Sequence, residues 1–169
     1  PTGADKCMDV NYETSSGLPV MSWGVASTSD NAADTIEVSR WGGSSWSTGI
    51  LSAMSNGDDA TYVDCEANPT ASSNDIACGS YGASTADIQA WTISAGAFGT
   101  EGLNLDTSAH ASSAGKSFVA TTYVVDGANV RGVVAWADAV SSPSDNQIDY
   151  SVLNGTWGAA TTTSKTFGD

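Results

Sequence analysis

Apolar and polar residues alternate along much of this chain with the period of two that marks a half-buried β-strand. Ile36 and Val38 alternate with Glu37 and Ser39, and residues 148–152 repeat the pattern. No window keeps apolar residues at the i, i+3, i+4, i+7 spacing of an amphipathic helix, and Gly, Ser and Thr interrupt every candidate. The pattern therefore predicts an all-β chain.

The predicted strands fall into three tandem units, 4–57, 58–114 and 115–169, with a period of about 55 residues. Each unit has three clear strands and a weaker fourth, joined by turn-forming residues such as those at Gly96 and Asn154–Gly155. The expected strands are 8–13, 19–24, 36–41 and 48–54, then 62–66, 76–82, 88–93 and 102–107, then 118–123, 133–137, 148–153 and 159–163. We expect each unit to be a four-stranded antiparallel sheet.

A four-stranded meander repeated around an axis is a blade of a β-propeller. Such units leave apolar residues on both faces, which stacking on neighbours must cover. Closed propellers have about four to eight blades, so three units predict a longer parent array, a six-bladed ring of two chains, or an open stack. A β-sandwich of duplicated hairpins is the alternative fold. Unpaired end strands recruit partners, so we do not expect a stable isolated monomer.

The charge of the chain limits its partners. Five Lys and Arg residues stand against 19 Asp and Glu residues, for a net charge of −14. This surface repels phosphate backbones and anionic membranes, and no apolar run reaches the ~20 residues that span a bilayer. Few charges and abundant Ser, Thr, Gly and Ala are typical of exported β proteins. We expect an extracellular or cell-surface location, and a processed or excised piece because the chain starts at Pro1.

Three cysteines are present. Cys65 and Cys78 lie in neighbouring predicted strands, and pairing those strands symmetrically about the loop 68–74 places the two residues opposite each other. This predicts a disulfide, with two reduced core cysteines as the alternative. Cys7 has no evident partner, which leaves a buried free thiol or a bond to another chain.

Aromatic residues recur at equivalent positions of the three units. An aromatic residue closes the turn after the third strand of each unit: Trp46 in the first, Phe98 in the second and Trp157 in the third. These rings are candidate platforms for stacking on sugars, and the alternative is that they pack strand four onto strand three. A second aromatic set, inside the second strand of each unit, is expected in the core: Trp23, Tyr81 and Trp136.

Trp91 departs from the repeat, because its counterparts are Ser39 and Ser151. By alternation it points away from the face of Ile88 and Ala90. It is therefore either exposed or pressed between units, and it is the first candidate for ligand binding.

Acidic loops are candidate metal sites. Asp30 and Asp34 flank Asn31 in one loop, and Asp145 occupies the equivalent loop of the third unit. Flexible loops with several oxygen ligands suit Ca²⁺, but neither loop has the spacing of a known calcium loop, and Asx residues also stabilise turns alone. We expect no cofactor, with Ca²⁺ as the alternative.

Catalytic motifs are lacking. A Ser–His–Asp triad would have to use His110, the only histidine, which lies in a linker of small residues without a nucleophile elbow. Nothing in the spacing of the acids selects a carboxylate pair for glycoside hydrolysis. The sequence from Asn154 to Thr156 fits the N-glycosylation pattern, and it also fits a plain hairpin turn. We expect no enzyme activity.

The segments 9–17, 20–23 and 40–46 resemble repeats of large bacterial surface proteins, which are similar to sialidase-like or lectin-like propeller blades. The second unit departs most, and the pair Arg40 and Arg131 is too small a set for a sialidase site. The resemblance implies a fold and no catalytic residue. We predict a non-enzymatic extracellular module for assembly or adhesion, with itself or further copies of the repeat as partner. The alternatives are a glycan-binding propeller that takes polysaccharide, and a fragment of an extracellular glycoside hydrolase.

Overall fold

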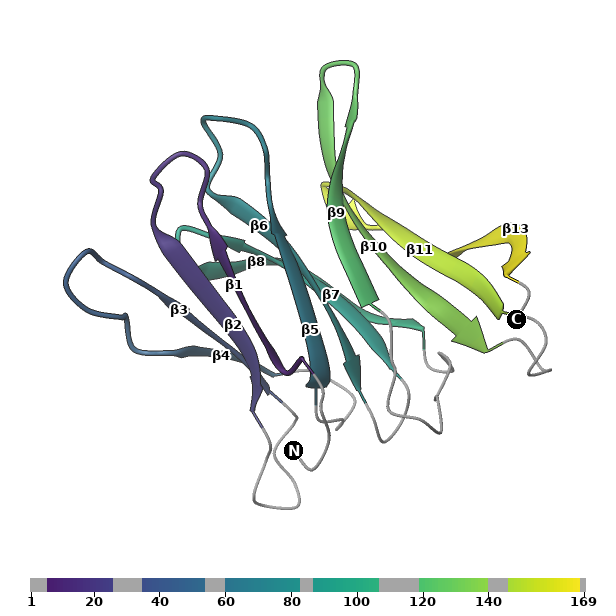
Figure 1. The fold of residues 1–169 in the computed structure, drawn as a ribbon, viewed down its shortest axis with the longest axis horizontal. Helices are drawn as coiled ribbons and strands as arrows, with labels where there is room; N and C mark the ends of the chain where they lie inside the picture. Colours follow the sequence, from purple (N-terminus) through teal and green to yellow (C-terminus); the bar gives the residue numbers. More distant parts are fainter. Residues whose placement is uncertain are drawn as a thin grey trace.

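The computed structural model describes residues 6–25, 35–53, 60–82, 87–106, 119–139 and 146–167. These residues form antiparallel strands and no helix, as the period-two pattern predicts (Figure 1). No helix in the described ranges is long and apolar enough to cross a membrane.

The strands form three separate sheets, each built from one consecutive stretch of chain. The first sheet contains β1 (Met8–Tyr12), β2 (Pro19–Val25), β3 (Thr35–Arg40) and β4 (Ile50–Ala53). The second contains β5 (Ala60–Ala67), β6 (Asp75–Gly82), β7 (Ile88–Ser94) and β8 (Ala97–Asp106). The third contains β9 (Val119–Asp126), β10 (Asn129–Ala139) and β11 (Asn146–Asn154), and β11 pairs with both β12 (Thr156–Trp157) and β13 (Thr161–Phe167). The alternative fold, a β-sandwich, consists of two packed sheets, whereas the described residues form three.

The turn between β7 and β8 differs from the sequence-based expectation. Strand β8 begins at Ala97 rather than at residue 102, because Ala95 and Gly96 form a two-residue hairpin turn. Both turn residues have positive φ, 51° and 78°, which gives the turn the twist that antiparallel strands favour. Positive φ is easy for glycine but uncommon for alanine, so the sequence signals only half of this turn.

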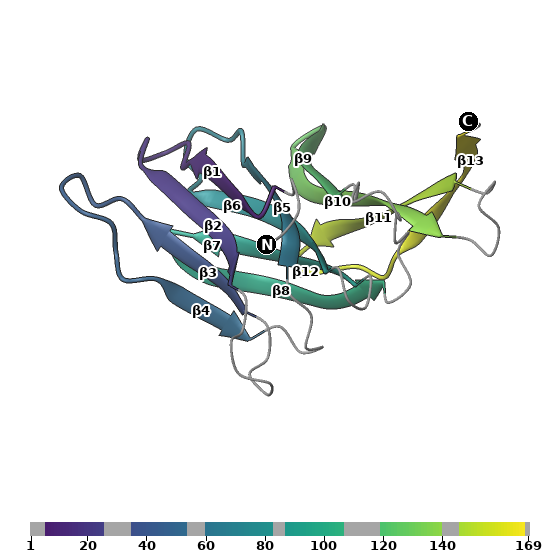
Figure 2. The same ribbon diagram turned by 60° about the horizontal axis from the view of Figure 1, so that its bottom comes forward.

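The sheets stack face to face, with β5 between β1 and β9 (Figures 1 and 2). The registers give equivalent positions on the first two strands of each sheet: Val10 opposite Met21, Cys65 opposite Cys78, and Thr121 opposite Val134. We call the face of each sheet that carries these residues its leading face, and the opposite face its trailing face. The trailing face of one sheet packs on the leading face of the next.

Two apolar clusters hold the stack together. Between the first and second sheets lie Val20, Ile36 and Val38 of the first sheet, and Val63, Cys65, Ile76, Cys78, Trp91 and Ile93 of the second. Between the second and third sheets lie Ala77, Tyr81, Ile88 and Ala90 of the second sheet, and Val119, Val134, Trp136 and Trp157 of the third. The core of this protein is therefore between sheets, as stacked repeats require.

Of the three aromatic residues expected in the core, Tyr81 and Trp136 are buried, but Trp23 is only half-buried. The expectation for Trp23 was wrong for a simple reason. Trp23 and Trp136 are equivalent residues of two leading faces, but no sheet in the described structure covers the leading face of the first sheet.

Candidate functional site

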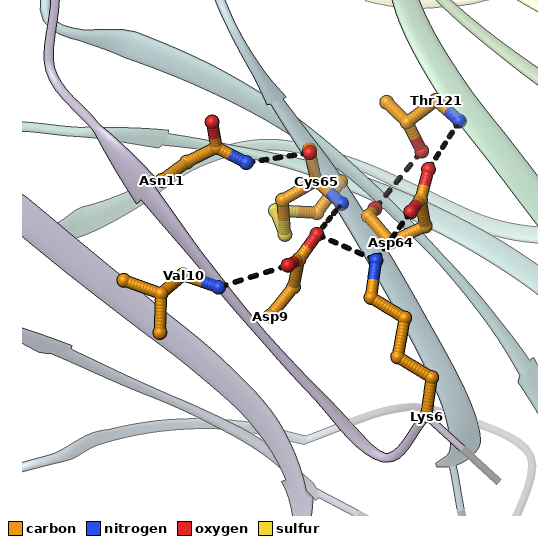
Figure 3. A network of polar contacts seen from close by, with 8 residues as sticks. Lys6, Asp9, Val10, Asn11, Asp64, Cys65 and Thr121 are labelled. Carbon is orange, nitrogen blue, oxygen red and sulfur yellow. Dashed lines mark hydrogen bonds and ion pairs between the residues drawn. A yellow bond between two sulfur atoms is a disulfide. The ribbon is translucent and has the colours of Figure 1, made fainter.

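Polar side chains connect β1, β5 and β9, the first strands of the three sheets, across the stack. The Asp9 carboxylate accepts a hydrogen bond from the backbone N–H of Cys65 at 2.8 Å. The Asp64 carboxylate likewise accepts one from the backbone N–H of Thr121 at 2.7 Å (Figure 3). We call each contact a carboxylate clamp. Hydrogen bonds to an ionised group are about twice as strong as neutral ones, so each clamp fixes one sheet against the next.

The backbone carbonyl groups of these strands are bound as well. The side-chain amide of Asn11 donates to the carbonyl oxygen of Cys65 at 2.6 Å, beside the Asp9 clamp (Figure 3). The hydroxyl of Thr121 donates to the carbonyl oxygen of Asp64 at 2.9 Å. Backbone N–H and C=O groups of these strands thus find partners on the neighbouring sheet, and this fixes the register of the stack.

Lys6 bridges the two clamps. Its ammonium group lies 2.9 Å from Oδ2 of Asp9 and 2.6 Å from Oδ1 of Asp64 (Figure 3). Partial burial lowers the pKa of Lys6, but hydrogen bonds to Asp64 and Asp9 outweigh this effect and raise the pKa above its ordinary value. The ammonium therefore stays charged at neutral pH and offsets the repulsion between the two carboxylates.

A buried ion pair lies farther along the first sheet. The Glu13 side chain is fully buried and accepts hydrogen bonds from Arg40, with 2.6 Å between Nη2 and Oε2. The hydrogen bond to Glu13 raises the pKa of Arg40. Arg40 also packs against the turn of the second sheet, where a Cβ atom on Gly96 would lie 2.7 Å from the Arg40 Cβ. The pair therefore fills the space between the first two sheets at this end of the strands.

The outer faces of the stack carry apolar side chains that no other sheet of the described residues covers. On the leading face of the first sheet, Met8, Val10 and Tyr12 are 46%, 41% and 61% exposed. The equivalents of Met8 and Val10 in the second sheet, Val63 and Cys65, are 0% and 5% exposed, and Ala67 at the position of Tyr12 is partly buried. The first sheet thus presents the kind of surface that its neighbours bury.

The trailing face of the third sheet shows the same relationship. Ile148 and Tyr150 are half-buried there. At the position of Ile148, the registers place Ile36 in the first sheet and Ile88 in the second, which are 0% and 1% exposed. Both ends of the stack therefore carry surfaces that match the two halves of its internal interfaces.

The aromatic residues proposed as sugar platforms have different environments. Trp157 is 8% exposed, and its indole N–H donates to the carbonyl oxygen of Thr100 on the neighbouring sheet at 3.3 Å. Phe98 is partly buried against the first apolar cluster. Only Trp46 is substantially exposed, at 42%, and it meets Trp41 edge to face with 5.7 Å between ring centroids. The structure does not bring these rings together into one platform.

Trp91 lies between the first two sheets and is 2% exposed. The structure therefore has the second of the two predicted environments, a ring pressed between units, and no face of the ring is open to a sugar. Ser39 and Ser151, its counterparts, donate instead to the carbonyl oxygens of Ser47 and Gly158. Trp91 replaces that repeated hydrogen bond with apolar packing, and its own buried N–H has no partner among the described residues.

The structure contains the Cys65–Cys78 disulfide that the sequence predicts, and it leaves Cys7 as a partly buried free thiol. The candidate metal ligands Asp30, Asp34 and Asp145 lie outside the described residues, as does His110. Within the described ranges, no three His, Cys, Asp or Glu residues are placed to hold a metal ion.

Sequence reasoning missed the carboxylate clamps. The available signal was an acid at the same position of two units, Asp9 and Asp64, with Ala120 at that position in the third. Acids on a strand are usually solvated, so the repetition alone did not single them out.

Comparisons of the chain with protein-family models, with curated proteins and with solved structures find no match. The likeness to propeller blades of bacterial surface proteins therefore stays a prediction from the residues.

Proposed function

We propose that this chain is a non-enzymatic assembly module of an extracellular structure, whose sheets act as propeller-like blades that stack from one chain to the next. The observation that carries the proposal is the equivalence of the outer faces to the internal interfaces. Val10 occupies the position of Cys65, and Ile148 occupies the position of Ile36, yet only the second member of each pair is buried.

The partner that fits these faces is a second copy of the chain, docked head to tail. Its third sheet would place its trailing face on the leading face of the first sheet, as the second sheet's trailing face packs on the third. Such a contact is heterologous, because two different surfaces meet. It closes into a ring if the rotation between sheets allows closure, and otherwise continues as a filament.

Apolar burial supplies the attraction in this contact. Met8, Val10 and Tyr12 on one side and Ile148 and Tyr150 on the other would leave water. The net charge of −14 on each chain opposes association, so screening by salt favours the assembled form. An extracellular location suits the buried disulfide, which persists under oxidising conditions.

Two blocked variants test the head-to-tail contact. Val10→Glu places a charge on the leading face of the first sheet, and Val133→Glu places one on the trailing face of the third. Each variant alone is expected to be monomeric by light scattering, because a head-to-tail contact needs both faces. An equimolar mixture is expected to form a dimer of two chains, because each variant keeps the face that the other lacks. Ser44→Glu, in an exposed turn, adds the same charge elsewhere and should leave association unchanged.

Persistent self-association of each variant alone would contradict the head-to-tail arrangement. A mixture that stays monomeric, although both variants fold, would contradict the assignment of these two faces to each other.

A further inference from the structure

Arg131 places a cation on the trailing face of the third sheet. It lies on β10 two residues before Val133, which shares that face, and it is opposite Val124, which is 48% exposed. Arg131 is half-buried and forms no ion pair within the described ranges. Its charge is therefore available to a partner that covers this face.

The leading face of the first sheet ends in a row of apolar neighbours on successive strands. Tyr12 is opposite Pro19, the backbone N–H of Trp41 donates to the carbonyl oxygen of Pro19, and Trp46 is opposite Trp41. We call these four residues the turn-end row, in which Tyr12 is 61% and Trp46 is 42% exposed. The equivalent rows of the other two sheets lie between sheets: Ala67, Ile76, Ile93 and Phe98 in the second, and Tyr123, Gly132, Leu153 and Trp157 in the third.

The contact between the second and third sheets shows what faces the tyrosine of such a row. Tyr123 stands at the position of Tyr12 in the third sheet. Asp75, on the trailing face of the second sheet, lines the same cleft as Tyr123. Burial raises the pKa of Tyr123, and the charge of Asp75 raises it further. Asp75 and Tyr123 therefore face each other across this contact.

The registers place Arg131 at the position of Asp75. Arg131 precedes Val134 by three residues, as Asp75 precedes its equivalent, Cys78. The β1–β2, β5–β6 and β9–β10 hairpins that carry these positions lie at the same end of the stack (Figure 1). A further sheet packed on the trailing face of the third sheet would thus meet Arg131 where Tyr123 meets Asp75.

We propose that Arg131 of one chain lies against the ring of Tyr12 in the next copy and selects the face that docks there. This inference rests on the proposed head-to-tail assembly. A guanidinium is attracted to the face of an aromatic ring, most strongly where water is excluded. Between separate chains of net charge −14, a cation at this position also offsets repulsion, which an acid such as Asp75 would increase. The pair forms only between unlike faces, because Arg131 and Tyr12 belong to opposite ends of the stack.

The blocked variants described above give a single contact for the test. Val10→Glu keeps the trailing face with Arg131, and Val133→Glu keeps the leading face with Tyr12. Sedimentation measures the dissociation constant of their mixture after Arg131→Asp is added to the first chain and Tyr12→Arg to the second. Each addition alone is expected to weaken the dimer about tenfold. Both together are expected to restore the dissociation constant to within about threefold, because Arg and Asp then face each other with their positions exchanged.

A second cycle introduces no charge. Arg131→Gln and Tyr12→Leu, each alone and then together, are expected to show a coupling of about fivefold in the dissociation constant. The control is Val125→Asp in the Val10→Glu chain, because Val125 is exposed on the opposite face of the same β9–β10 hairpin. This control should leave the dissociation constant unchanged.

The outcomes separate this pair from the assembly itself. Blocked variants that stay monomeric in their mixture would contradict the head-to-tail contact and, with it, the pair. A dimer that forms, but in which Tyr12→Arg does not rescue Arg131→Asp and the uncharged substitutions act independently, would contradict the pair alone. Circular dichroism of each variant shows whether a weaker dimer reflects the contact or the fold.

Discussion

The carboxylate of Asp9 accepts a hydrogen bond from the backbone N–H of Cys65, 56 residues along the chain and on the next sheet. Asp64 binds Thr121 in the same way across the next interface, 57 residues along the chain. A repeated side chain that binds the backbone of the following unit fixes the register between sheets, while apolar burial alone would allow them to slide.

Replacing Asp9 by alanine is expected to destabilise the fold, because the N–H of Cys65 loses its partner and Lys6 loses one of two carboxylates. We expect a loss of about 1.5 kcal/mol in the free energy of unfolding, the lower end for a hydrogen bond to a charged group, because water reaches Asp9. Urea unfolding measures this as a lower midpoint at unchanged slope. Asp126→Ala, at an exposed strand end, is the control, and an equal loss there would contradict the role of the clamp.

The third sheet lacks a clamp residue, because Ala120 stands where Asp9 and Asp64 stand in the other two. In the proposed assembly, Ala120→Asp would present a carboxylate to the N–H of Val10 in the next copy. We expect association about tenfold tighter, measured by sedimentation as a lower dissociation constant.

The matched control for that change is Thr122→Asp. Residue 122 is on the same face and is equivalent to Asn11, which donates to a carbonyl group. A carboxylate there faces an acceptor and should not tighten association. Equal effects of the two substitutions would show that the position of the carboxylate does not matter.

The disulfide closes a loop between residues 13 positions apart, in the middle of the first apolar cluster. Loops of this length give a stabilisation of about 3 kcal/mol through restriction of the unfolded chain. Reduction should therefore lower the free energy of unfolding by about that amount, measured by urea unfolding with and without a reductant. Thiol titration of the unreduced, unfolded protein should find one free thiol, that of Cys7, and three would contradict the bond.

Asp149 gives the stability of the fold a pH dependence. Burial raises the pKa of Asp149 above its ordinary value of 3.8, a hydrogen bond from Thr162 partly offsets this, and the charge of Asp106 raises it further. The folded protein thus binds this proton more tightly than the unfolded chain does. The resulting stabilisation is complete below pH 3.8 and is lost as the pH rises through the folded-state pKa.

Asp149→Asn cannot ionise, so this variant does not lose stability as the pH rises, and its side-chain amide keeps an oxygen that accepts a hydrogen bond from Thr162. We expect the variant to melt at a higher temperature than the unchanged chain at pH 7, by roughly 2–4 °C for each kcal/mol gained, with little difference at pH 3. Thermal unfolding at the two pH values measures this. A lower melting temperature at pH 7, or the same difference at both values, would contradict a buried ionised Asp149.

The strands and their grouping into three units could be predicted from the sequence, because both depend on local periodicity. The alternation at Ile36 and Val38 predicts a strand, and the opposed cysteines predict the disulfide. The environment of Trp23 could not be predicted, because alternation tells which face a residue is on and not what covers that face. The contacts of Asp9 with Cys65 and of Asp64 with Thr121 join residues of different units, and their proximity becomes visible only in the stacked sheets.

Sedimentation velocity of the unmodified chain across micromolar concentrations tests the assembly proposal most directly. We expect species heavier than the 17.1 kDa chain, whose share grows with concentration and with added salt as the repulsion between acidic chains is screened. A single 17.1 kDa species at every concentration and salt level would contradict it.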